Sequence, residues 1–246
     1  MSDSKVVLVT GCAKVASATE YCKAFAEQKC KVFASDVSQR MADIDLDSLD
    51  NYDIDTLELD VCSDQSVESA VNTIISKCGR IDVVINNAGI GSTGPLAELP
   101  LETIRRAWEI NTLGQLRLVQ QVVPHMALRR SGSIVNIGSV VGKVPTPWAG
   151  SYCASKAYVH AMSNTLRVEL KPFGIDVVLR ELGPLKGVKQ TEASVFAKHL
   201  AEKVLGPKPP RLISFGHMTG LLLCFLALLF GERSFLSTRF NLNKKL

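Results

Sequence analysis

Residues 5–36 read KVVLVTGCAKVASATEYCKAFAEQKCKVFASD, and this stretch decides the fold class. Two short apolar runs, residues 6–9 and 31–34, flank a segment at residues 19–28 that has the character of an amphipathic helix. Neither run alternates apolar with polar residues, so each predicted strand needs cover on both faces. The stretch therefore predicts a strand, a helix and a second, parallel strand.

The same alternation continues along the chain. Further strands are predicted at residues 57–61, 83–85, 133–137, 175–179 and 212–215. Further helices are predicted at residues 64–77, with Ser63 as N-cap, and at 101–129, 151–173 and 191–204. This order predicts an α/β fold: a doubly wound Rossmann-type parallel sheet of about seven strands with helices on both faces.

Length and composition favour one large domain. The chain has 246 residues, 46% apolar and 21% charged, which is enough to build a sizeable core. We expect a dinucleotide-binding and catalytic domain at residues 1–216 and an apolar, basic extension at 217–246. The seven cysteines contain no Cys-x-x-Cys pair and the histidines are not clustered, so we predict no metal site, no disulfide framework and a reducing compartment.

The first turn carries the features of a nucleotide site. Thr10 and Gly11 end the first strand and open the turn into the first helix, where a pyrophosphate would meet backbone amides. Asp36 closes the second strand, where a carboxylate can accept the hydroxyls of an adenosine ribose, which favours NAD. Lys14 and Arg40 could instead neutralise a ribose phosphate, as NADP requires. Both cofactors remain open at this point.

A second group of residues predicts acid–base chemistry. Ser139 follows the strand at 133–137, and Tyr152 and Lys156 come 13 and 17 positions later, on one face of a helix. An ammonium beside a phenol is expected to lower the pKa of the phenol, which is otherwise near 10. Ser139 would hold a substrate oxygen while Tyr152 donates or removes its proton. Such a Tyr-x-x-x-Lys pair is usually only a surface feature, but here Asn86-Asn87-Ala88-Gly89 and Asn111-Thr112-Leu113-Gly114 accompany it.

With these motifs in this order, the chain resembles the short-chain dehydrogenase/reductase family over residues 5–216. The resemblance implies a catalytic set made of Ser139, Tyr152, Lys156 and Asn111. It implies that Asn111 holds a water linking Lys156 to solvent, and that Lys156 also binds the nicotinamide ribose. The expected cofactor-binding residues are Gly11, Lys14, Asp36, Asp60, Asn87, Tyr152 and Lys156. The start at Thr10-Gly11-Cys12 and the stretch at 215–218 resemble the branch with NADPH-dependent 1-acyldihydroxyacetone-phosphate reductases, which favours NADP(H).

Three departures from the family pattern bear on activity. Ala16 and Ala18 stand where the family has two further glycines, so their methyl groups could obstruct a phosphate. Residues 182–184 read Leu-Gly-Pro where the family usually has Pro-Gly. The substrate loop is shortened near residues 184–191, which would weaken substrate recognition and water exclusion.

The C-terminal stretch suggests a membrane surface. Residues 221–230 are all apolar, about 15 Å of helix, too short to span about 30 Å of hydrocarbon. Residues 198–246 carry eight Lys or Arg and only two Glu, whereas the net charge of the whole chain is +4. We expect an interfacial anchor, with a helix buried in a subunit interface or core as the alternative.

These observations lead to two hypotheses. The first is an oxidoreductase that moves hydride between NADP(H) or NAD(H) and a carbonyl or alcohol, with a small-molecule, lipid-like substrate such as 1-acyldihydroxyacetone phosphate. The second is a catalytically impaired family member that acts as a binding or assembly protein. Either would be cytoplasmic, on the cytosolic face of the endoplasmic reticulum or of lipid droplets if anchored. A homodimer is implied by the resemblance, and no basic stripe interleaved with aromatics indicates nucleic-acid binding.

Overall fold

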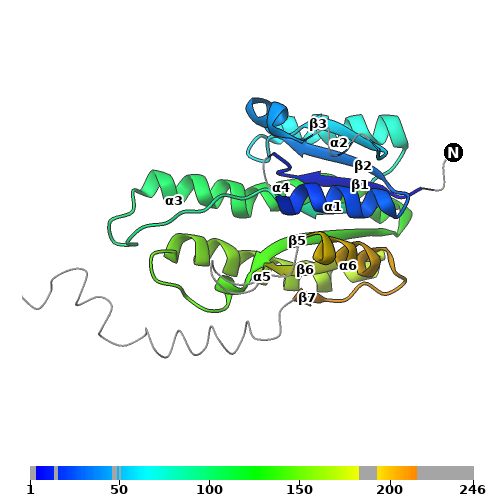
Figure 1. Ribbon diagram of the computed structural model, residues 1–246. Helices are drawn as coiled ribbons and strands as arrows, with labels where there is room; N and C mark the ends of the chain where they lie inside the picture. The colour runs from blue at the N-terminus through cyan, green and yellow to red at the C-terminus, as the bar shows by residue number, and fades with distance from the viewer. Residues whose placement is uncertain (1–3, 14–15, 46–48, 50, 183–192, 215–246) are drawn as a thin grey trace, which may run out of the picture.

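Seven parallel strands form one sheet at the centre of the molecule (Figure 1). The structure, a computed structural model, describes residues 4–13, 16–45, 49, 51–182 and 193–214. The strands are β1 (Val6–Thr10), β2 (Lys31–Asp36), β3 (Ile54–Glu58), β4 (Val83–Asn86), β5 (Gly132–Ser139), β6 (Ile175–Leu182) and β7 (Leu212–Ser214). Their order is β3-β2-β1-β4-β5-β6-β7. The predicted fold class is confirmed.

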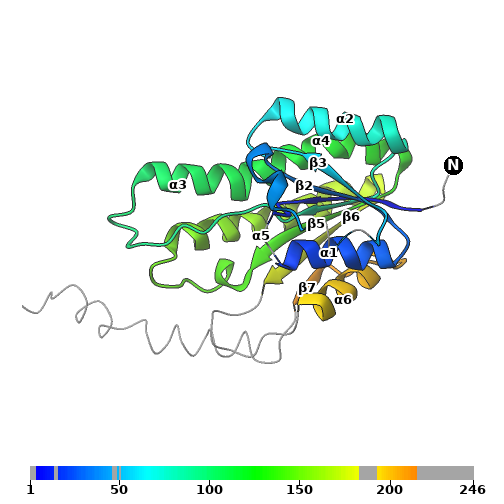
Figure 2. The ribbon, with the colours of Figure 1, turned by 45° about the horizontal axis from the view of Figure 1, so that its top comes forward.

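Helices cover both faces of the sheet (Figure 2). They are α1 (Ala16–Glu27), α2 (Asp64–Cys78), α3 (Leu101–Trp108), α4 (Gly114–Arg129), α5 (Gly150–Leu170) and α6 (Ala193–Leu205). One apolar cluster joins α1 and α6 to one face, and a second joins α2, α4 and α5 to the other. Short 3-10 helices occupy Ser38–Asp43, Val140–Gly142 and Lys171–Phe173.

The inner strand β1 shows why consecutive apolar residues are needed. In β1, Val7 and Val9 pack into the α1/α6 layer, while Val6 and Leu8 pack into the opposite layer. Full burial of such a side chain contributes roughly 1.5–3 kcal/mol. A strand with apolar residues on only one side would leave one of these layers without cover.

The prediction for the third strand was wrong by three positions. The sequence analysis placed it at residues 57–61, but β3 is Ile54–Glu58 and pairs with β2 at Val32↔Ile54. β3 is an edge strand whose Asp55 contacts Lys31 and Lys77, so it lacks a continuous apolar run. Residues 59–61 belong to the loop that leads into α2.

The long helix predicted at residues 101–129 is interrupted. A π-helical turn, Glu109–Leu113, separates α3 from α4 without breaking the helical path. Gly114 begins α4 against Val61: a Cβ built on this glycine would lie 2.8 Å from Val61 Cγ2. The other predicted helices are confirmed to within three residues, and Ser63 caps α2 by accepting a hydrogen bond from the Ser66 amide. Residues 191–192 of the predicted last helix lie outside the described residues.

The strand order places a crevice between β1 and β4. The chain runs outward in one direction from β1 to β3, then returns and runs in the other direction from β4 to β7. The chain therefore continues from β1 and from β4 into helices on opposite faces of the sheet, and ligands bind at such a point on the carboxyl edge of open α/β sheets.

Candidate active site

Gly11 brings the loops after β1 and β4 into contact. Its φ is +73°, and a Cβ at this position would lie 2.7 Å from Ala88 Cα. Thr10 Oγ1 accepts hydrogen bonds from the amides of Asn87 (3.1 Å) and Ala88 (3.0 Å). The Asn87 side-chain amide donates to the carbonyl oxygens of Thr10 (2.9 Å) and Gly11 (3.0 Å). Only glycine combines this backbone conformation with this approach.

We expect Gly11→Ala to destabilise the protein and to weaken dinucleotide binding. The methyl group meets backbone atoms, so one of the two loops must move, and a strained φ costs of order 1–3 kcal/mol. Gly79→Ala is the matched control, because Gly79 has φ +77° but open space around its Cβ position. Urea unfolding should show a larger loss for Gly11→Ala, and titration with NADPH should show weaker binding for that variant alone. Equal losses in the two variants would mean that the approach to Ala88 is unimportant.

Asp36 is a structural acceptor as well as a wall of the cavity. Its Oδ2 accepts from the Ala13 amide (2.8 Å) and its Oδ1 from the Val37 amide (2.9 Å). Arg40 donates from Nη2 to the Ala13 carbonyl oxygen at 2.7 Å. From the sequence, Asp36 favours NAD and Arg40 could serve NADP, but in the structure both side chains bind the same loop through Ala13. Lys14, the other cation, lies outside the described residues.

Asp60 reaches the cavity from the loop after β3. Its Oδ1 accepts from the Cys62 amide at 2.9 Å, and its backbone amide donates to Ser66 Oγ at 2.9 Å. These bonds fix the loop at the N-terminus of α2. Asp60, Leu59 and Val61 line the same side of the cavity as Asp36.

Lys156 is buried on α5 and already has a partner. Its Nζ donates to the Ile137 carbonyl oxygen at 2.7 Å and lies 5.6 Å from the centre of the Tyr152 ring. Burial lowers the pKa of Lys156 from 10.5 to about 8. The lysine thus sits between the end of β5 and the tyrosine, as the i, i+4 spacing predicted.

Tyr152 departs from the expected electrostatics. Burial raises its pKa above 10.0, the nearby Cys153 adds to this effect, and a hydrogen bond with Ser139 opposes it. The predicted lowering of the phenol pKa was therefore wrong for this arrangement, because loss of water outweighs the stabilising contacts. Ser139 itself ends β5 with its side chain buried.

Asn111 lies in the π-helical turn and clamps the loop after β4. Its Oδ1 accepts from the Ile90 amide (2.8 Å), and its Nδ2 donates to the Ile90 carbonyl (2.9 Å) and to Ser155 Oγ (3.1 Å). Ser155 Oγ in turn donates to the Tyr152 carbonyl oxygen at 2.8 Å. Asn111 thereby ties the β4 loop to the helix that carries Tyr152 and Lys156.

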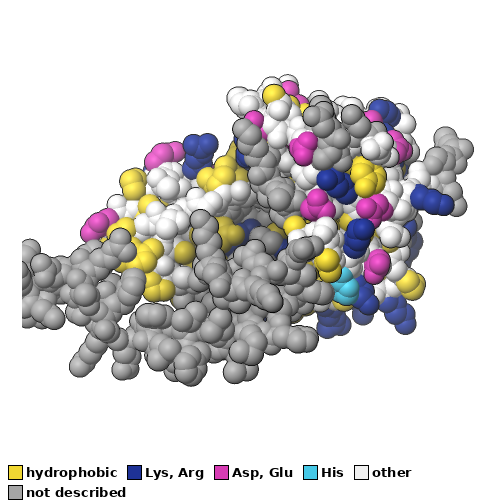
Figure 3. Space-filling view, viewed as in Figure 1, with side chains coloured by type: hydrophobic (Ala, Val, Ile, Leu, Met, Phe, Trp, Pro, Cys, Tyr) yellow, Lys and Arg dark blue, Asp and Glu magenta, His cyan; other side chains and the backbone are white. Residues whose placement is uncertain are grey.

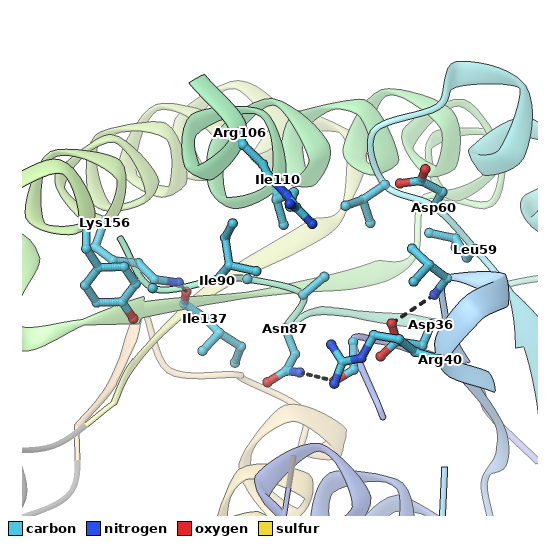
Figure 4. Close-up of a pocket in the computed structure, with 17 residues that line it drawn as sticks. Asp36, Arg40, Leu59, Asp60, Asn87, Ile90, Arg106, Ile110, Ile137 and Lys156 are labelled. Atoms are coloured by element: carbon cyan, nitrogen blue, oxygen red, sulfur yellow. Dashed lines mark hydrogen bonds between the residues drawn. The ribbon is translucent and has the colours of Figure 1, made fainter. Parts of the chain in front are cut away.

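One cavity of about 340 Å³ joins the two ends of the predicted site (Figure 4). The predicted residues that line it are Gly11, Asp36, Asp60, Asn87, Tyr152 and Lys156. Ser139 and Asn111 do not line it; they contact the residues that do. Figure 3 shows a hollow near the centre of this face, with Lys or Arg atoms visible inside.

Sequence reasoning missed Arg106. It extends from α3 into the cavity, between Ile110 and Asp60 (Figure 4). In the sequence, Arg106 is marked only by its spacing, five residues before Asn111 and one helical turn before Ile110. This spacing is a weak signal, because surface arginines on amphipathic helices are common. The cavity is thus lined by two guanidinium groups, Arg40 beside Asp36 and Arg106 beside Ile110 (Figure 4).

These residues fit a nicotinamide dinucleotide. The cavity lies at the strand-order reversal, Gly11 lines it at the turn after β1, and carboxylates line one end. A phenol and a buried ammonium line the other end, as hydride transfer to a carbonyl requires. The fold and the site together are those of a short-chain dehydrogenase.

Comparison with known proteins agrees. The family model for short chain dehydrogenases matches residues 5–195, and the chain belongs to this family, whose members are NAD(P)-dependent oxidoreductases. Retinol dehydrogenase 8 of Bos taurus is 37% identical over 158 residues, 64% of this chain and 49% of that protein. The NADPH-dependent 1-acyldihydroxyacetone phosphate reductase of Schizosaccharomyces pombe is 34% identical over 179 residues, 72% of this chain and 58% of that protein.

A solved short-chain dehydrogenase from Streptomyces avermitilis shares the fold with a TM-score of 0.82 and 23% identity, over 99% of both chains. By contrast, this chain spans only about half of the length of the retinol dehydrogenase and of the acyldihydroxyacetone phosphate reductase. Among the described residues, no helix has both the length and the apolar character needed to cross a membrane.

Proposed function

We propose that this chain is an NADP(H)-dependent oxidoreductase that interconverts a carbonyl and an alcohol, with Tyr152 as the acid–base group. One observation carries the proposal: Tyr152 and Lys156 line the same cavity as Gly11 and Asp36. A bound nicotinamide would supply or accept the hydride. Tyr152 would pass a proton to or from the substrate oxygen, and Ser139 would orient that oxygen by hydrogen bonding.

Lys156 and Asn111 act through the tyrosine and the cofactor in this proposal. Below about pH 8 Lys156 carries its charge 5.6 Å from the centre of the phenol ring, where in this proposal it works against, without outweighing, the burial that raises the pKa of Tyr152. Asn111 positions the Tyr152 helix through Ser155 and would hold the water that leads to Lys156. The remaining nucleotide contacts fall to Asp60, Asn87 and Lys14.

The NADP(H) assignment rests on charge in the cavity. Arg40 lines it beside Asp36 and Arg106 lines it beside Ile110 (Figure 4), and either guanidinium group could neutralise a ribose phosphate. The carboxylate of Asp36 already accepts two backbone amides, which leaves it less free to bind ribose hydroxyls. The relative from S. pombe is also NADPH-dependent.

We expect Asp36→Asn to shift cofactor preference toward NADPH by about tenfold or more, since it removes a negative charge beside the ribose. Asparagine keeps one acceptor oxygen for the loop, which alanine would not. Dissociation constants for NADPH and NADH, measured by calorimetry on both proteins, check this expectation. An unchanged ratio would remove Asp36 as the discriminating residue.

A lipid-like substrate, such as 1-acyldihydroxyacetone phosphate, completes the proposal. It rests on the S. pombe relative and on the apolar residues 221–230, which lie outside the described residues. In this proposal the protein faces the cytosol and contacts the surface of the endoplasmic reticulum or of lipid droplets. Flotation with lipid vesicles, with and without residues 217–246, tests the contact. A homodimer is proposed too, supported by exposed apolar side chains on α4 and α5, among them Leu128 and Val168.

A second function, binding without catalysis, has its own support. The pKa of Tyr152 is raised, Lys156 Nζ is taken by the Ile137 carbonyl, and Ala16 and Ala18 replace glycines. Titration with NADPH and NADH, followed by a panel of carbonyl substrates, separates the two. Binding with turnover supports the oxidoreductase, whereas binding of neither nucleotide supports the second function.

A further inference from the structure

Arg180 is a buried cation that forms no ion pair with any carboxylate in the described part of the chain. It lies on β6 with 7% of its surface exposed, and its Nε and Nη1 have no hydrogen-bond partner among the residues that the structure describes. Its guanidinium carbon lies 3.7 Å from the centre of the Phe196 ring and 5.7 Å from that of Tyr21. Burial lowers the pKa of Arg180.

These ring contacts do not balance the charge. Removing a cation from water costs more free energy than a cation–π contact returns, even when that contact is desolvated. Tyr21 adds a second donor, since its hydroxyl is also buried without a partner in the described part of the chain. Two kinds of unused donor, one of them charged, thus occur together between α1 and α6.

Arg180 does not line the cavity itself but lies next to a residue that does. On β5 and β6, Arg180 is paired in register with Ile137, which lines the cavity and carries the carbonyl that binds Lys156. Paired residues on neighbouring strands project to the same side of a sheet. Ile137, Tyr21 and Phe196 all belong to the α1/α6 layer, so Arg180 lies in that layer beside Ile137.

From this arrangement we infer that Arg180 and Tyr21 form a binding site for a phosphoryl group. A guanidinium offers two parallel N–H donors to phosphate oxygens, and the positive end of the α1 dipole lies at the same edge of the sheet. The inference rests on the proposed function for the source of the group: the diphosphate of the dinucleotide, or a phosphate carried by the substrate. For the diphosphate, Arg180 would add a charged donor beside a first turn and helix start where Ala16 and Ala18 replace the glycines that let a phosphate approach the backbone.

The test compares the full chain with Arg180→Met, Arg180→Lys and Tyr21→Phe by calorimetry. Adenosine, ADP-ribose and inorganic pyrophosphate are the probes for the diphosphate. For Arg180→Met we expect affinity for ADP-ribose to fall about 10- to 100-fold, because a charged hydrogen bond is lost, with adenosine unaffected. Arg180→Lys should fall between, and Tyr21→Phe should lose a few-fold. Two further measurements test whether the substrate carries the phosphoryl group. One is the affinity for glycerol 3-phosphate, and the other compares steady-state KM values for phosphorylated and unphosphorylated substrates.

Two measurements test whether a loss of affinity comes from misfolding: the melting temperature of Arg180→Met and the affinity of a matched arginine variant. Arg180→Met removes an unpaired buried charge, so its melting temperature should be equal to or above that of the natural chain. Arg167→Met should lose stability with no change in affinity, because Arg167 on α5 donates to the carbonyls of Val177 and Arg211 across the sheet.

The possible results distinguish this site from the proposed function. If Arg180→Met binds every phosphorylated probe and substrate as well as the natural chain does, the site is wrong and the proposed function stands. If the natural chain binds no dinucleotide but binds pyrophosphate or glycerol 3-phosphate through Arg180, the proposed function fails and the site stands. If it binds no phosphorylated compound at all, both are wrong.

Discussion

Replacing Tyr152 by phenylalanine should lower kcat by about 10²- to 10⁴-fold while leaving NADPH affinity nearly unchanged. In the proposed reaction the phenol oxygen of Tyr152, which lines the cavity, exchanges a proton with the substrate, and general acid–base catalysis contributes this range. The ring, which packs near the Lys156 ammonium, is preserved in the variant. Single-turnover rates with NADPH and a reducible carbonyl substrate, alongside nucleotide titration, measure the two quantities separately.

Tyr158→Phe is the control for this prediction. Tyr158 lies on the same helix, but its ring packs against Trp108, with 5.6 Å between ring centres, and it does not line the cavity. This variant should keep the activity of the natural chain. Turnover by Tyr152→Phe at the natural rate would exclude Tyr152 as the acid–base group.

The second large effect is expected at Lys156. The folded protein holds the Lys156 proton less tightly than the unfolded chain does, with a pKa of about 8 against 10.5. The unfolded chain therefore binds more protons between these two values, and the Lys156 contribution to the free energy of unfolding rises with pH across that window. Below about pH 8 the full penalty, on the order of 3 kcal/mol, is present.

Lys156→Met removes this pH dependence. The free energy of unfolding of the natural chain, minus that of the variant, should increase by about 3 kcal/mol from pH 7.5 to pH 10.5. Urea unfolding at several pH values measures the difference and cancels the other titrating groups. Activity should also fall, because the charge beside Tyr152 is lost. Parallel stability curves for the two proteins would contradict the lowered pKa.

Much of the fold was accessible from the sequence because its signals are local. Runs such as residues 6–9 and 83–85 have to be buried on both sides, which parallel strands with helices on both faces achieve. β3 was misplaced because an edge strand needs no such run, and its polar Asp55 contacts lysines from β2 and α2 instead. Edge position is a property of the assembled sheet, which a local pattern does not contain.

The candidate site divides in the same way. Gly11, Asp36 and Lys156 were found because strand ends and helical spacing place them at one edge. The double use of the Asp36 carboxylate depends on where Ala13 lies after folding, and the pKa of Tyr152 depends on how much water the folded chain removes. Arg106 and Arg180 resemble ordinary helix and strand residues in the sequence, and only their three-dimensional surroundings distinguish them.

The π-helical turn at Glu109–Leu113 changes the direction in which the side chains of α4 point relative to those of α3. Each residue of an α-helix advances the side-chain direction by about 100°, so one additional residue rotates everything after it relative to everything before it. Trp108 can therefore face Tyr158 while Gly114 meets Val61 on another side. Deleting one residue here would leave the apolar spacing within α3 and within α4 unchanged. It would, however, rotate Asn111 away from Ile90. For this helix, length in residues matters as much as composition.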